Sequence, residues 1–127
     1  MYTVVRFQSD SPDPGSLISA GQALNARRPG MFDGLDCVEG RMSCSICQDR
    51  SWDTHVSEMQ LFLNDFDALI TEARKRSIRI EFDVAIDAED YSGGKTYLSF
   101  RLPSELINLL AVKTVSIMIT YYLIAKT

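Results

Sequence analysis

Residues 78 to 87, "IRIEFDVAID", constrain the fold more than any other stretch of this 127-residue chain. Apolar side chains occupy every second position, and charged side chains fill most of the positions between them. A period of two predicts a β-strand in which alternate side chains point to opposite faces of a sheet. We therefore expect one face of this sheet to be buried and the other to be solvated or covered by polar groups.

Further strands and three helices follow from composition and spacing. β-branched and aromatic residues predict strands at 2–8, 40–48, 96–102 and 114–124. Helical patterns lie between them, at 14–24, 53–76 and 103–112. The central helix is expected to be capped by Asp53 or Thr54 and to bend near Asn64 and Asp65, since these residue types compete for backbone hydrogen bonds.

The element order is therefore β-α-β-α-β-β-α-β, which predicts the α+β class. We expect an approximately five-stranded, mainly antiparallel sheet with two or three helices packed on one face. A hydrophobic fraction of 46% is ordinary for a globular protein, and 127 residues suffice for a hydrophobic core. The chain is interpreted as a single domain spanning 1–127.

Charge and hydropathy narrow the function classes. The net charge is −4 and the pI is about 4.9, whereas nucleic-acid-binding domains usually carry a basic surface. The N-terminal residues lack the pattern of a secretory signal, and polar residues interrupt the apolar run near the C-terminus. We expect a cytoplasmic protein with reduced cysteines, no cofactor, and neither a nucleic-acid nor a membrane partner.

The segment "CVEGRMSCSICQDRSWDTH", residues 37–55, holds all three cysteines and the only histidine. Cys37, Cys44, Cys47 and His55 form a candidate zinc site or a thiol nucleophile with its base. On a strand, however, residues three apart point to opposite faces, so Cys44 is expected in the core and Cys47 outside it. A buried structural role for Cys44 is the favoured interpretation, and no metal site is predicted.

Acidic residues are concentrated in the middle of the chain. Positions 31–70 hold eight Asp and Glu residues against two arginines. This run is either an ordinary solvated face or a surface that attracts a basic protein partner. Trp52 is expected to cover the edge of the core with its indole N–H bonded to the backbone, or to act as a binding hot spot. The candidate partner-binding residues are Asp33, Asp36, Asp49, Trp52, Asp53, His55 and Glu58.

Residues 48–123 resemble a bacterial α+β domain family of unknown function that is similar to immunity proteins. The resemblance rests on "SWDTHVSEM" before the central helix, on "EARKRSIRIEFDVAID", and on "YLSFRLPSELINLLAVKTVSIMITYY". It implies a role in neutralising a bacterial toxin by protein–protein contact, and it supplies no catalytic residue. Ser77 stands where the family usually has glycine.

The leading hypothesis is thus a non-enzymatic immunity protein that docks a toxin on its acidic surface, as a monomer or a homodimer. One alternative is a small enzyme or zinc protein that uses the Cys37, Cys44, Cys47 and His55 cluster. The other is a homodimeric structural module that pairs through the exposed edge of its last strand.

Overall fold

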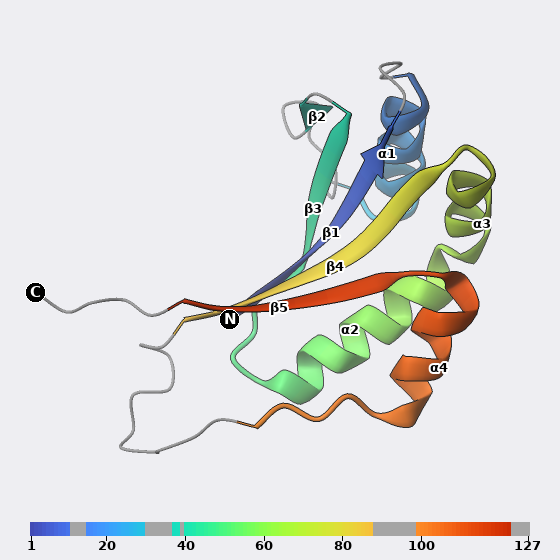
Figure 1. Ribbon diagram of the computed structural model, residues 1–127. Helices are drawn as coiled ribbons and strands as arrows, with labels where there is room; N and C mark the ends of the chain where they lie inside the picture. Colours follow the sequence, from blue (N-terminus) through green and yellow to red (C-terminus); the bar gives the residue numbers. More distant parts are fainter. Residues whose placement is uncertain (11–14, 30–36, 39, 88–98, 123–127) are drawn as a thin grey trace, which may run out of the picture.

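The computed structural model describes residues 1–10, 15–29, 37–38, 40–87 and 99–122 (Figure 1). Within these ranges the elements are β1 (Tyr2–Ser9), α1 (Gly15–Arg27), β2 (Cys37–Val38), β3 (Arg41–Cys47), α2 (Trp52–Asp65), α3 (Asp67–Lys75), β4 (Ile78–Asp87), α4 (Ser104–Lys113) and β5 (Ser116–Tyr122). The α+β class is confirmed.

The sheet is mixed, with strand order β2-β3-β1-β4-β5. Four of these strands are seven to ten residues long, whereas β2 contributes only two residues. The β2–β3, β3–β1 and β1–β4 pairs are antiparallel, and β4–β5 is parallel. The prediction of a mainly antiparallel sheet is therefore confirmed. A parallel pair needs a crossover connection, and α4 supplies it between β4 and β5.

The observed elements differ in detail from the predicted ones. Of the strand expected at 96–102, residues 99–102 are described and form no strand, while 96–98 lie outside the described residues. The described part of the chain has four helices instead of two or three, because the central helix is divided at Phe66. Phe66 adopts φ −108° and ψ 28°, so the predicted bend is confirmed. The cap of α2 is Ser51, not Asp53 or Thr54.

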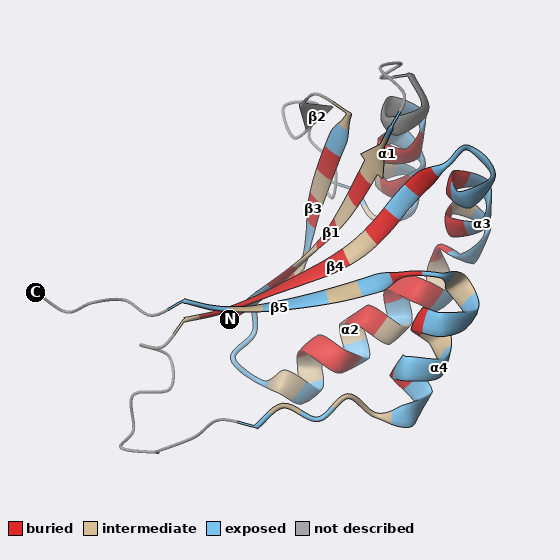
Figure 2. Ribbon diagram, in the orientation of Figure 1, coloured by how far each residue is buried: buried red, intermediate tan, exposed pale blue. Residues whose placement is uncertain are grey.

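All four helices pack on one face of the sheet, and the core lies between the two layers (Figures 1 and 2). β4 has the predicted alternation, since its even-numbered residues face the helices. The buried strand residues on this face include Val5, Phe7, Met42, Cys44, Ile78, Ile80, Phe82, Val84 and Ile86. The helices contribute the other half of the core, with Leu24, Met59, Phe62, Leu63, Ile70, Leu106 and Leu110.

The opposite face of the sheet, here called the open face, carries no helix (Figure 1). Its polar character agrees with the prediction from β4. Asp83 and Ala85 are exceptions, because they lie on this face and are nevertheless buried. Both occupy the middle of the sheet, where side chains of β1 and β5 flank them on either side.

A β-bulge in β3 makes the predicted orientation of Cys47 wrong. Val4 of β1 lies opposite Ser45, but the preceding Thr3 lies opposite Cys47, so one residue of β3 is left without a partner. An extra residue breaks the two-residue period of a strand. Cys47 therefore points to the same face as Cys44, and both are buried, at 9% and 2% exposure. The predicted burial of Cys44 is confirmed.

Candidate functional site

His55, the only histidine, lies in the core with no exposed surface. Its Nδ1 is 2.7 Å from the hydroxyl of Thr3, and its Nε2 is 2.5 Å from the backbone carbonyl oxygen of Asp49. A carbonyl oxygen can only accept, so Nε2–H donates to Asp49, and in a neutral ring Nδ1 then accepts from the Thr3 hydroxyl. The imidazole thereby joins β1 to the loop between β3 and α2. Because it is fully buried, it is not accessible to a protein partner.

The loop of residues 48–51 and the start of α2 are fixed by further local hydrogen bonds. The Asp49 carboxylate accepts from the backbone N–H of Ser51 at 2.7 Å, and the Ser51 hydroxyl accepts from the N–H of Thr54 at 3.4 Å. The second contact caps α2. Asp49 and Asp53 are exposed on either side of this cap. Both carboxylates therefore project from a backbone that is held in one conformation.

Trp52 is half-buried and connects the start of α2 to the segment before α4. Its indole N–H donates to the carbonyl oxygen of Arg101 at 2.6 Å, which confirms the predicted backbone contact. Its ring packs edge-on against Phe100, with the ring centroids 5.2 Å apart. Such a contact adds to the stabilisation from burial. Part of the Trp52 ring remains exposed, and Trp52 lies between Asp49 and Asp53 in sequence. We call Asp49, Trp52 and Asp53 the acidic corner.

Much of the acidic run is neutralised by cations that are distant in sequence. Arg28, at the end of α1, lies 3.9 Å from the Glu58 carboxylate and 2.8 Å from that of Asp65. Lys113 of α4 pairs with Asp67. Asp33 and Asp36 lie outside the described residues. Asp49 and Asp53 are the described acids of this run that form no ion pair within the described part of the chain, and exposed Arg50 lies between them in sequence.

The structure does not bring the cysteines and the histidine together as metal ligands. Cys44 and Cys47 form no disulfide, and His55 uses both ring nitrogens for Thr3 and Asp49. Among the residues that are described, no three His, Cys, Asp or Glu side chains cluster closely enough to hold a metal ion. The side chain of Cys37 lies outside what is described. The described geometry offers no support for the zinc or nucleophile hypothesis.

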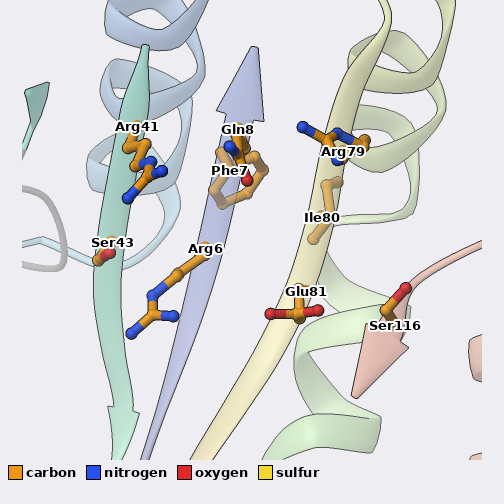
Figure 3. A pocket seen from close by; sticks show the side chains of 9 residues that line it. All are labelled: Arg6, Phe7, Gln8, Arg41, Ser43, Arg79, Ile80, Glu81 and Ser116. Atoms are coloured by element: carbon orange, nitrogen blue, oxygen red, sulfur yellow. The ribbon is translucent and has the colours of Figure 1, made fainter. Parts of the chain in front are cut away.

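A second polar site lies on the open face, and sequence reasoning missed it. A pocket of about 530 Å³ lies over β3, β1 and β4 (Figure 3). Its polar lining consists of Arg6, Gln8, Arg41, Ser43, Arg79, Glu81 and Ser116. Phe7 and Ile80 also border it, although their side chains belong to the buried face. Period-two alternation places each arginine on a polar face, but only the strand order shows that the three strands are adjacent.

Within the described residues, no helix combines the length and apolarity that a membrane crossing requires. In the comparisons with known proteins, no protein-family model, no curated protein and no solved structure matches this chain. The function is therefore inferred from the geometry of the chain itself.

Proposed function

We propose that this chain is a non-enzymatic binding protein that neutralises a basic toxin domain by docking it on the acidic corner. The observation that carries the proposal is a pair of exposed carboxylates without ion-pair partners among the described residues, Asp49 on the loop that His55 holds and Asp53 in the first turn of α2. Trp52 lies between them and is anchored at both its ring and its N–H.

The rigidity of this corner favours binding. Association costs free energy for each side chain and loop that becomes ordered, and a preorganised surface avoids much of that cost. Tryptophan is also among the residues that contribute most at protein interfaces. The hydrogen bonds of Asp49, Ser51, Trp52 and His55 therefore do more than cap a helix, since they hold the Trp52 ring, the Asp49 carboxylate and the backbone that carries Asp53.

The charge distribution supports a basic partner. Pairing of Glu58, Asp65 and Asp67 with Arg28 and Lys113 leaves Asp49 and Asp53 as the described acids of residues 31–70 without an ion pair. Concentrated charge steers an oppositely charged partner and raises the association rate, with an effect that falls as salt rises.

The test measures binding to the product of a neighbouring gene, the expected source of a cognate toxin. Titration calorimetry is run at 50 and 300 mM salt with the wild type and with the Asp49→Lys/Asp53→Lys variant. We expect tight, salt-sensitive binding that the variant loses. The control Glu72→Lys makes the same kind of charge reversal on exposed α3 and is expected to retain binding. Unchanged affinity in the Asp49/Asp53 variant would refute the proposal.

A second candidate, a homodimer through β5, is favoured by one observation. β5 pairs only with β4 among the described strands and carries no charged residue. Its exposed large side chains are Met118, Ile119, Tyr121 and Tyr122. An unprotected apolar edge strand is a template for pairing with another chain. Light scattering measures the molar mass in solution and so distinguishes a monomer from a dimer. A wild-type dimer that Tyr121→Lys converts to a monomer supports this candidate, whereas a wild-type monomer rejects it.

A further inference from the structure

We propose that the open face of the sheet binds a small organic phosphate in the pocket formed by Arg6, Gln8, Arg41, Ser43, Arg79 and Glu81, here called the arginine pocket. The pocket lies on the side of the sheet that carries no helix, and its residues come from three adjacent strands (Figure 3). This inference is independent of the acidic corner, since the two sites share no residue.

Strand register sets the arrangement of the donors. Gln8 of β1 lies opposite Arg41 of β3 on one side and opposite Arg79 of β4 on the other. Arg41, Gln8 and Arg79 therefore form one row across the sheet, with neighbouring Cα atoms about 5 Å apart. In the next row, Arg6 has Ser43 and Glu81 as its neighbours. Arg41 and Arg79 thus flank the Gln8 side chain, whereas the Arg6 guanidinium points away from Gln8 and pairs with Asp83 (Figure 3).

The three arginines differ in how firmly they are held. The Arg41 side chain forms no hydrogen bond or ion pair with any residue in the described part of the chain. Arg79 pairs with Asp10 at 3.0 Å, but both side chains are more than 60% exposed, and such a pair exchanges easily. Arg6 is fixed by Asp83 at 2.6 Å, and the Asp83 side chain is only 7% exposed. Two arginines are therefore available to a ligand, beside a third that is already positioned.

The chemistry of the donors favours a phosphate group. Guanidinium groups bind phosphate and carboxylate oxygens through paired N–H donors. A phosphate has three free oxygens and up to two charges, so it uses several converging donors better than a carboxylate does. Among the residues that line the pocket, three arginines face one acid, Glu81, and Arg6 and Arg79 are paired with Asp83 and Asp10 just outside that lining.

Glu81 and the pocket volume define the rest of the ligand. The Glu81 carboxylate lies one row from the Arg41–Gln8–Arg79 row, so it repels a second anionic group and accepts hydrogen bonds from hydroxyls. An acidic peptide would meet that repulsion, and a nucleic acid requires a longer basic surface. A volume of about 530 Å³ is in the range of small-molecule sites. A phosphorylated sugar fits these conditions, because its phosphate group can bind the arginines while its hydroxyl groups donate hydrogen bonds to Glu81.

The test is a titration of the full chain, followed by NMR at constant ionic strength. The ligands are glucose 6-phosphate, inorganic phosphate, malonate and glucose. We expect glucose 6-phosphate to bind saturably and to shift the side-chain signals of Gln8, Arg41 and Arg79, and we expect glucose to have no effect. Arg41→Gln and Arg79→Gln each remove one pair of charged N–H donors. Each variant should weaken the binding of glucose 6-phosphate about tenfold or more.

Two variants complete the design. Arg76→Gln removes the same charge at the end of α3, away from the pocket, and should leave the affinity within about twofold. Glu81→Gln should raise the affinity for inorganic phosphate, because it removes the negative charge that repels it. It should also reduce the difference in affinity between glucose 6-phosphate and inorganic phosphate, because it removes the carboxylate that accepts hydrogen bonds from the sugar hydroxyls. Three results would overturn the proposal: no saturable binding of glucose 6-phosphate, unchanged affinity in both arginine variants, or malonate binding as tightly as glucose 6-phosphate.

Discussion

Replacement of His55 by leucine tests whether the buried imidazole holds the β3–α2 loop in place. Leucine fills most of the volume of the imidazole but has neither a donor nor an acceptor. The Thr3 hydroxyl, itself fully buried, then loses its acceptor, and the Asp49 carbonyl loses its donor. Each buried polar group left unpaired costs about 1–3 kcal/mol, so we expect the free energy of unfolding to fall by about 3 kcal/mol.

Thr3→Val isolates one half of this network. Valine is close in shape to threonine, and it leaves only the imidazole Nδ1 without a donor, which predicts a loss of about 1–2 kcal/mol. In the double variant, the second substitution removes a group whose partner is already absent. The combined loss should therefore be at least about 1 kcal/mol smaller than the sum of the single losses.

Urea denaturation of the single and double variants, followed by circular dichroism, measures these free energies. Thr71→Val makes the same change at an exposed position of α3, and its effect should add to that of His55→Leu. A loss below about 1 kcal/mol for His55→Leu, or strict additivity with Thr3→Val, would refute the assigned network. Hydrogen exchange at residues 49–54 provides a second readout, since a released loop exchanges faster.

Two further substitutions test other features of the fold. Thr114, which ends α4, is β-branched and has a φ of 56°, so Thr114→Gly should raise the free energy of unfolding by about 1 kcal/mol and increase the Tm by a few degrees. Thr114→Ala serves as its control and should bring no such gain. Arg6→Gln removes the ion-pair partner of the buried Asp83 carboxylate and should cost about 2–3 kcal/mol in urea denaturation. Most of that loss should be recovered by Asp83→Asn in the same chain, and a failure to recover would contradict the assigned pair.

Local patterns predicted those parts of the fold that depend on neighbours in sequence. The alternation of β4 is strong enough to fix its buried face, and the break at Phe66 follows from the polar residues just before it. The backbone contact of Trp52 was also expected, because a half-buried indole N–H needs an acceptor. In each case the structure is decided by burial of regularly spaced apolar side chains or by the hydrogen-bonding requirement of one polar group.

Features that depend on partners distant in sequence were not predicted. The bulge that turns Cys47 inward is a property of the β1–β3 register, and nothing in "CSIC" encodes it locally. His55 is buried because Thr3, 52 residues away, supplies its hydrogen bond. Ser77 adopts a φ of 58°, a conformation that glycine adopts without strain, and no local pattern around this serine predicts it.

Charge shows most clearly why strand order matters for the candidate sites. Along the sequence, the acidic run between residues 31 and 70 is prominent and the arginines are dispersed. In three dimensions, Arg28 and Lys113 neutralise part of that run, while the order β3-β1-β4 brings Arg41, Arg6 and Arg79 onto adjacent strands. Among the described residues, the fold thereby pairs part of the acidic run and gathers three arginines that are dispersed in the sequence. Because the two proposed sites share no residue and involve different strands and loops, each proposal can be tested without altering the other site.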